Sequence, residues 1–204
     1  MKKYLPIFSI LVLALFGFKG DTQLASKLGK SVQDFRLQNI DGRFVALKDY
    51  QHAKGIMVVF TCNHCLFAKL YTNRYNQLNS KYSKLGVPLI AINAMDTLLY
   101  DEESFALMQQ KAKTEKFNFP YLYDATQAVG KDFGANHTPH AYIIWQENKQ
   151  WIVKYSGGID DNGDHPEKAK PFIANAVNTL LQGKKIANPE TQSFGCKIFY
   201  RKSK

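Results

Sequence analysis

The sequence predicts an α/β protein with a central mixed β-sheet, helices on its faces and an N-terminal β-hairpin. Residues 56–60 form an unbroken apolar run, which is typical of a strand buried on both faces of a mostly parallel sheet. From residue 66 to residue 82 apolar side chains recur at spacings of three and four, which indicates a helix that buries one face. A second apolar strand is expected at 87–93, and strand, helix and strand in this order form a right-handed crossover unit.

The remaining elements extend this sheet. Asp41-Gly42 stands between apolar residues at 35, 37, 45 and 47 and is a strong signal for a tight hairpin. Together with the crossover unit, the elements that follow make the thioredoxin arrangement. They are a helix at 102–115, a short strand at 121–123, a short helix at 127–133, antiparallel strands at 141–145 and 151–155, and a helix at 171–181.

Length and composition indicate one globular domain behind a leader. The chain has 204 residues, of which 45% are hydrophobic and 22% charged, enough for one sizeable core. A basic start and an apolar stretch too short for a comfortable membrane span predict a secretory signal peptide, with an uncleaved anchor as the alternative. The expected division is a signal peptide at 1–20, a connector at 21–33, a thioredoxin-like domain at 34–186 and a basic C-terminal tail at 187–204.

The formal net charge of +10 is concentrated at the two ends of the chain. No nucleic-acid-binding motif accompanies these charges, so nucleic acid is not an expected partner. The leader and the tail are instead expected to be solvated, with contact to an anionic membrane surface as a further expectation. The residues concerned are Lys2, Lys3 and Lys19 in the leader and Lys197, Arg201, Lys202 and Lys204 in the tail.

Cys62 and Cys65 stand where the first apolar strand ends and the amphipathic helix begins. Free backbone N–H groups and the helix dipole favour a thiolate at such a position, so we expect Cys62 to have a lowered pKa and to be the attacking thiol. Cys65 would then close a disulfide with it. Zinc usually needs a second ligand pair at short spacing, and Cys196 is the only other cysteine, so the pattern favours redox chemistry without a metal or another cofactor.

Six short motifs follow one another along the chain: FTCNHC at 60–65, YLYDATQ at 121–127, TPH at 138–140, GIDDN at 158–162, PET at 189–191 and GCKI at 195–198. This ordered set resembles the redoxin proteins of the alkyl hydroperoxide reductase and thiol-specific antioxidant superfamily, in particular its peroxiredoxin-like, thioredoxin-domain branch. The resemblance covers about residues 30–200. It implies a thioredoxin fold, thiol–disulfide redox activity, and Cys62 with Cys65 as the active pair.

The resemblance also implies a substrate-binding edge. In this fold a cis proline faces the cysteine pair, and the backbone of the residue before it pairs with an extended substrate, which places those roles on Thr138 and Pro139. Thr61 and His64 are further candidates for contact with the substrate. A protonated His64 would stabilise a thiolate, whereas a solvent-facing His64 would have little effect. His137 and His140 are expected at the surface or in packing, and Asp160, Asp161 and Asp164 in a solvated turn rather than a metal loop.

Some features depart from the family pattern. Leu66 stands where the branch usually has a proline, and no proline precedes Cys62, which makes peroxidase activity doubtful. Thioredoxins bury a carboxylate on the strand before the pair, but residues 56–61 contain none. Cys196 has two interpretations: a buried cysteine that packs as a small hydrophobe, or a resolving thiol.

The favoured function is an exported, periplasmic or extracytoplasmic thiol–disulfide oxidoreductase, free or tethered to the membrane. Its partners would be protein thiols and disulfides or a partner reductase. One alternative is a thiol peroxidase in which Cys62 reacts with peroxide and is resolved by Cys65 or Cys196. The other is a carrier that holds Cu(I) between Cys62 and Cys65 with a histidine.

Overall fold

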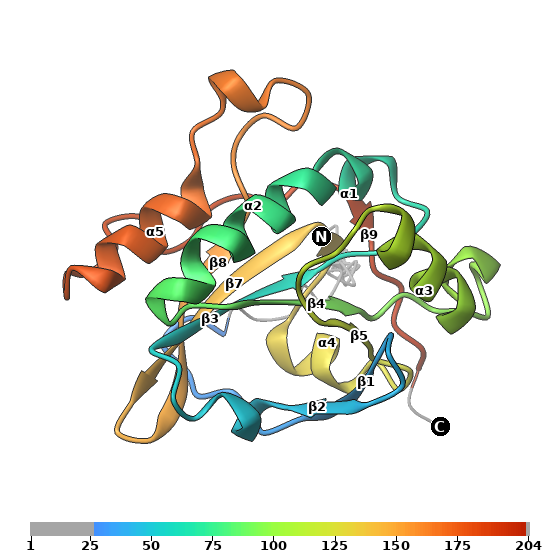
Figure 1. The fold of residues 1–204 in the computed structure, drawn as a ribbon, viewed down its shortest axis with the longest axis horizontal. Coiled ribbons are helices and arrows are strands. Elements are labelled where there is room, and N and C mark those ends of the chain that lie inside the picture. The colour runs from blue at the N-terminus through green and yellow to red at the C-terminus, as the bar shows by residue number, and fades with distance from the viewer. Residues whose placement is uncertain (1–26, 203–204) are drawn as a thin grey trace, which may run out of the picture.

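The computed structural model describes residues 27–202, which form a seven-stranded mixed sheet with helices on both faces (Figure 1). The strand order is β2-β1-β5-β4-β3-β7-β8, and β6 (His137–Thr138) and β9 (Cys196–Lys197) form a separate pair. This architecture confirms the expected thioredoxin-like α/β fold. The expected signal peptide at 1–20 lies outside the described residues. Within 27–202 the helices are too short or too polar to cross a bilayer.

The strand that leads into the cysteine motif lies at the centre of the sheet. β3 (Gly55–Phe60) is buried along its whole length and pairs in parallel with β4 (Leu89–Asn93) and antiparallel with β7 (His140–Glu147). β4 pairs in parallel with β5 (Tyr121–Tyr123), and β7 pairs antiparallel with β8 (Gln150–Gly157). The continuous apolar sequence of β3 is therefore explained by neighbours on both sides and cover on both faces.

Two hairpins complete the sheet. In the first, β1 (Arg36–Asn39) pairs antiparallel with β2 (Phe44–Ala46), and Gly42 takes a φ of +85° in the turn. β1 also pairs with β5, so this hairpin covers one edge as expected. The second hairpin joins β7 and β8 through Asn148 and Lys149, which both have positive φ. Such a turn matches the twist of the strands, and the two strands consequently pair further than the sequence predicted.

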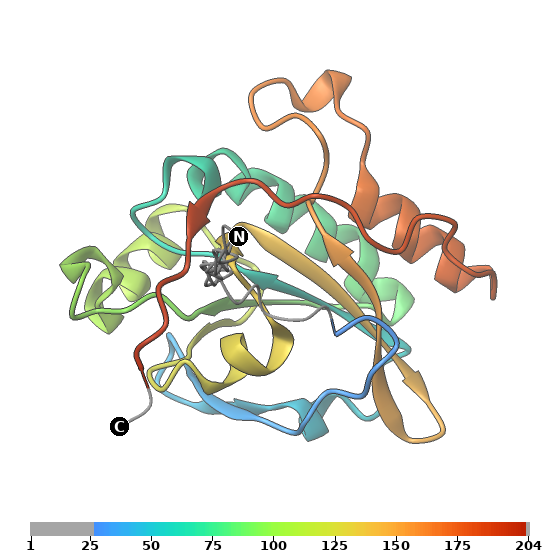
Figure 2. The same cartoon turned by 180° about the vertical axis from the view of Figure 1, so that it is seen from behind.

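Helices cover the sheet unequally. α2 (Thr72–Tyr82), α3 (Phe105–Thr114) and α5 (Phe172–Leu181) bury their apolar residues against one face of the sheet. α4 (Ala128–Phe133) packs against the opposite face, together with residues of the N-terminal connector (Figures 1 and 2). The predicted helix at 102–115 is shorter at its start, because residues 101–103 form a separate 3₁₀ turn.

The predicted helix from 66 to 82 is two helices. α1 (Leu66–Leu70) ends at Leu70 and α2 begins at Thr72, with Tyr71 between them. Tyr71 and the apolar residues of α2 reach the sheet, but Leu66 and Phe67 are 75% and 51% exposed. The apolar stripe is thus only partly buried, and its first turn presents an apolar surface beside the cysteine motif.

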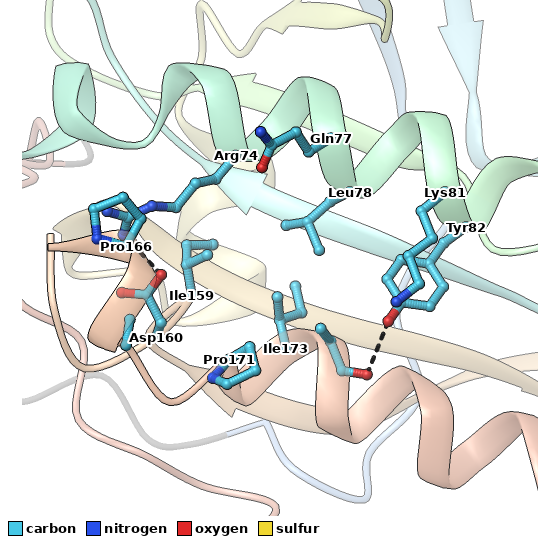
Figure 3. Close-up of a pocket in the computed structure, with 12 residues that line it drawn as sticks. Arg74, Gln77, Leu78, Lys81, Tyr82, Ile159, Asp160, Pro166, Pro171 and Ile173 are labelled. Carbon is cyan, nitrogen blue, oxygen red and sulfur yellow. Dashed lines mark hydrogen bonds and ion pairs between the residues drawn. The ribbon is translucent and has the colours of Figure 1, made fainter.

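Asp160 is buried rather than solvated, so the prediction of a solvated turn was wrong at this residue. Its carboxylate accepts hydrogen bonds from Arg74 at 2.7 Å and from the Tyr71 hydroxyl at 3.0 Å. Arg74 also donates to carbonyl groups of the same loop. Figure 3 shows this pair at one end of a pocket of about 250 Å³ between α2 and α5. The ion pair ties the loop after β8 to α2.

The C-terminal tail returns across the molecule. After α5 it runs to β9 and then along the side of α4 (Figure 2). Ile198 is buried, and the Arg201 guanidinium lies 3.7 Å from Asp96. The backbone N–H of Arg201 donates to Gln127. The tail therefore packs on the domain through its backbone and Ile198, while the basic side chains of Lys197, Arg201 and Lys202 are exposed.

Candidate active site

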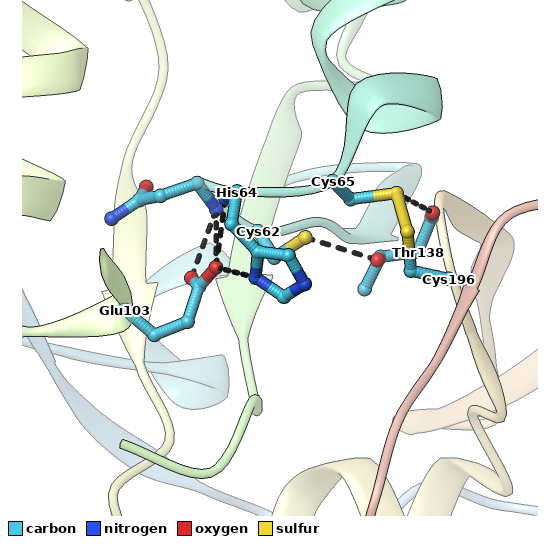
Figure 4. The surroundings of a disulfide bond; sticks show 7 residues. Cys62, His64, Cys65, Glu103, Thr138 and Cys196 are labelled. Carbon is cyan, nitrogen blue, oxygen red and sulfur yellow. Dashed lines mark hydrogen bonds and ion pairs between the residues drawn. A yellow bond between two sulfur atoms is a disulfide. The ribbon is translucent and has the colours of Figure 1, made fainter. Parts of the chain in front are cut away.

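The three cysteines of the chain meet at the end of β3 (Figure 4). Cys65 forms a disulfide with Cys196 of β9, and Cys62 is a free, fully buried thiol. The disulfide expected between Cys62 and Cys65 is therefore not the one present. Cys196 is neither unpaired nor a simple packing residue. All three cysteines of the chain thus lie at one site (Figure 4).

The peptide between Thr138 and Pro139 is cis and lies beside the cysteines, as predicted. The Thr138 hydroxyl is 3.0 Å from the sulfur of Cys62. The Thr138 carbonyl oxygen is 3.2 Å from the sulfur of Cys65. A disulfide sulfur carries no proton, so this second approach is a contact that becomes a hydrogen bond when Cys65 is a thiol. One residue thus touches both cysteines of the motif.

The prediction of a lowered pKa for Cys62 was wrong. Burial, followed by the negative charge of Glu103, raises the pKa of Cys62 to about 12, against smaller opposing effects of the Thr138 hydroxyl and the Cys65 amide. The expected helix N-terminus is absent at this residue, because α1 begins only at Leu66. The N–H groups of Asn63 and His64 donate to Glu103 instead of facing the sulfur.

Glu103 supplies the buried carboxylate that the strand before the motif lacks. It is inaccessible to solvent and accepts hydrogen bonds from the backbone of Asn63 and His64, each at 2.9 Å, and from Asn93 at 2.6 Å. This role could not be predicted from the local sequence, since Glu103 follows two other acids in a polar stretch. Its carboxylate fixes the loop between Cys62 and Cys65.

The His64 side chain is 22% exposed and is held by two neighbours. Its Nδ1 lies 2.6 Å from Glu103, and its ring stacks on Tyr100 with centroids 4.3 Å apart. Thr61 is 1% exposed, at the end of the central strand. Burial keeps the Thr61 side chain from a polypeptide at the surface, so its predicted role in substrate binding does not fit its position.

One group of possible metal ligands occurs among the described residues. Ligand atoms of Cys62, His64 and Glu103 lie within 4.8 Å of one another. Cu(I) prefers soft thiolate ligands, but Cys65 is held in a disulfide, and the oxygens of Glu103 already accept several hydrogen bonds. The alternative of a carrier that holds Cu(I) between Cys62 and Cys65 with a histidine therefore does not fit the disulfide form of the protein.

His140 follows the cis proline and is a packing residue, as expected. Its Nε2 lies 3.1 Å from the Ser156 hydroxyl and its Nδ1 3.3 Å from the Tyr142 hydroxyl. Burial, followed by the charge of His137, lowers the pKa of His140 to about 3. The unfolded chain therefore binds this proton more readily than the folded protein does.

The neutral state of His140 predicts acid sensitivity. The free energy of unfolding should fall as the pH drops from about 6.5 towards about 3, by at most about 1.4 kcal/mol per pH unit from this group. In denaturant titrations from pH 7 to pH 4, the free energy of unfolding should depend less on pH in His140→Gln than in the wild type. The exposed His52→Gln variant is the control and should keep the wild-type slope. An equal pH dependence of stability in His140→Gln and in the wild type would contradict the role given to His140.

Known proteins are similar to this chain in sequence and in structure. The "Thiol-disulfide oxidoreductase ResA" of Geobacillus thermodenitrificans is 27% identical over 173 residues, which are 81% of this chain and 94% of that protein. A hypothetical protein from Sinorhizobium meliloti has a structure with a TM-score of 0.79 and 26% identity, covering 88% of this chain and 97% of its own. The structure of an uncharacterized conserved protein from Geobacillus kaustophilus has a TM-score of 0.78 and 34% identity. The match covers 87% of this chain and 94% of that protein.

A family model described as the AhpC/TSA family matches residues 28–158. The match includes Cys62, Cys65 and the cis proline, whereas Cys196 lies beyond it. Because the matched region spans more than half of the chain, the protein belongs to the AhpC/TSA family.

Proposed function

We propose that this protein is an exported thiol–disulfide oxidoreductase in which Cys65 exchanges with protein thiols and disulfides and Cys62 resolves the mixed disulfide. The family and the ResA relatives make it an oxidoreductase that acts on thiols and disulfides. One observation carries the division of roles. Cys65 is already bonded to a sulfur from a distant segment, whereas Cys62 is a buried free thiol.

The reaction needs only the cysteines. After a dithiol has reduced the Cys65–Cys196 disulfide, the thiolate of Cys65 attacks one sulfur of a substrate disulfide, which forms a mixed disulfide and releases one substrate thiolate. Cys62 then loses its proton and attacks the sulfur of Cys65, which forms the Cys62–Cys65 disulfide and releases the second substrate thiolate. A dithiol of a partner reductase restores both thiols. The same steps in reverse oxidise a substrate dithiol.

The peroxidase alternative finds less support. A cysteine that reacts with peroxide must be an accessible thiolate, but Cys62 has no exposed surface and its pKa is raised to about 12. Export is a separate part of the proposal. It rests on the expected signal peptide at 1–20 and on a disulfide, which persists in an oxidising compartment such as the periplasm. Contact with a membrane through the leader or the tail belongs to the same proposal.

Turnover of a protein disulfide tests the function. Insulin reduction with dithiothreitol should be accelerated by the wild-type protein and not by Cys65→Ser. Consumption of hydrogen peroxide under the same conditions should stay close to the rate without protein. Peroxide consumption that outpaces insulin reduction, or full activity in Cys65→Ser, would overturn the proposal.

Thr138→Val should slow the step that Cys62 carries out. A hydrogen bond to a charged group contributes about 1.5–3 kcal/mol, and the Thr138 hydroxyl can donate to the Cys62 thiolate, so the resolving step should slow by about 10- to 100-fold. Single-turnover release of substrate from the mixed disulfide measures that step. Thr72→Val is the control, since the hydroxyl of Thr72 is buried without a hydrogen bond to the described residues. Equal rates in the two variants would remove Thr138 from the mechanism.

A further inference from the structure

The tail crosses the active site as an extended strand. β9 pairs antiparallel with β6, with Cys196 opposite Thr138 and Lys197 opposite His137. The N–H of Ile198 donates to the carbonyl of Asn136 at 2.9 Å and continues the pairing. The backbone edge before the cis proline is therefore occupied by residues of the same chain (Figure 4).

The residue before Cys196 fits this edge only without a side chain. A Cβ atom on Gly195 would overlap the carbonyl oxygen and carbon of Thr138. These are backbone atoms at the site itself, so the strand could not keep its pairing with any larger residue there. A polypeptide that lies here needs glycine immediately before its cysteine.

Phe194 indicates what a bound polypeptide needs two residues before its cysteine. It lies at a groove of about 220 Å³ that also includes Phe67, Leu70 and Pro139. Phe67 and Leu70 come from the side of α1 that the sheet does not cover, and they are 51% and 43% exposed. The groove beside the cis proline thus offers an apolar contact to the second residue before the cysteine.

The crossing segment is held on both sides. Before it, the backbone of Pro189 and Thr191 pairs with Ser156 at 3.0 Å. After it, the Tyr200 hydroxyl donates to the carbonyl of Ala135. Such anchors keep Cys196 at a high local concentration near Cys65 even when the disulfide is open.

We propose that residues 194–197 are an internal substrate, and that target polypeptides bind in their place, extended along β6 with a cysteine at the position of Cys196. The targets would carry glycine directly before that cysteine and an aromatic or apolar residue before the glycine. This inference rests on the function proposed above, because Cys65 must be the cysteine that bonds to the target.

Release of the tail needs no outside reagent. Cys62 loses its proton and attacks the sulfur of Cys65, so that the Cys65–Cys196 bond breaks and a Cys62–Cys65 disulfide forms. The thiolate of Cys196 leaves and takes a proton. One disulfide replaces another, and the edge of β6 becomes free for a target. Since the tail competes for this edge, Cys196→Ser should lower the KM for a peptide target several-fold.

Labelling of Cys65 by peptides tests the inference. The protein is Cys62→Ser/Cys196→Ser, in which Cys65 is the only cysteine. The probe is a peptide of residues 191–200 whose cysteine carries a 2-nitro-5-thiobenzoate leaving group. Attack by Cys65 joins the peptide and releases the coloured thiolate. A second peptide has valine at Gly195, and a third has alanine at Phe194.

The native peptide should react at least tenfold faster than the Gly195→Val peptide and about threefold faster than the Phe194→Ala peptide. The same order is expected with reduced wild-type protein, which guards against misfolding of the double variant. Equal rates for the native and Gly195→Val peptides would overturn the inference and leave the proposed function intact. Failure of every peptide to release the coloured thiolate with reduced wild-type protein would overturn the proposed function and the inference with it.

Discussion

Cys62→Ser, in a Cys196→Ser background that removes the second thiol able to attack Cys65, is expected to stop turnover and to accumulate the protein as a mixed disulfide with its substrate through Cys65. Serine is close to cysteine in size, so the buried position should be retained, but a hydroxyl cannot attack the mixed disulfide. Because Cys62 and Cys65 act as a unit, loss of either thiol should remove most of the activity. Insulin reduction should therefore fall at least about a hundredfold. Nonreducing electrophoresis and peptide mapping should locate the adduct on Cys65.

The reciprocal variant separates the two roles. Cys65→Ser should form no stable adduct on Cys62, because Cys62 is inaccessible and has a pKa raised to about 12. Cys62→Ala should trap substrate as Cys62→Ser does, which shows that the effect comes from loss of the thiol. Adducts on Cys62 in the Cys65→Ser protein would reverse the assignment of the exchanging and resolving cysteines.

Local patterns predicted the frame of this site well. The apolar run of β3 and the turn at Asp41-Gly42 each need only neighbours in sequence, and both are where they were expected. The position of Thr138 and Pro139 beside the motif was predicted from resemblance to a family, and the structure confirms it. These features depend on short-range chemistry or on a fold that many sequences share.

The electrostatics of the site could not be predicted in the same way. The helix-dipole argument for Cys62 requires that helix begin at the motif, but α1 begins at Leu66 and the loop amides bond to Glu103. Nothing near Glu103 marks which of three consecutive acids is buried. The pairing of Cys65 with Cys196 likewise depends on the path of the tail, which no periodicity encodes.

Glu103→Gln is expected to destabilise the protein strongly. The carboxylate accepts hydrogen bonds from two backbone N–H groups and from the Asn93 and His64 side chains. All of its partners are donors, so it acts only as an acceptor. The amide nitrogen of glutamine would place a donor against these donors and leave at least one buried group unpaired. The free energy of unfolding should fall by about 3 kcal/mol. For a chain of this length that corresponds to a fall in Tm of about 6–12 °C.

Glu102→Gln is the matched control for stability, because Glu102 is the exposed neighbour and should tolerate the same change with little effect. A second readout separates the charge of Glu103 from its hydrogen bonds. That charge raises the pKa of Cys62, so its removal should lower this pKa. Thiolate absorbance against pH, in a Cys65→Ser/Cys196→Ser background where Cys62 is the only cysteine, measures the shift. A Tm equal to that of Glu102→Gln, or a Cys62 titration that stays in place, would show that the carboxylate does not control the loop or the thiol as the structure indicates.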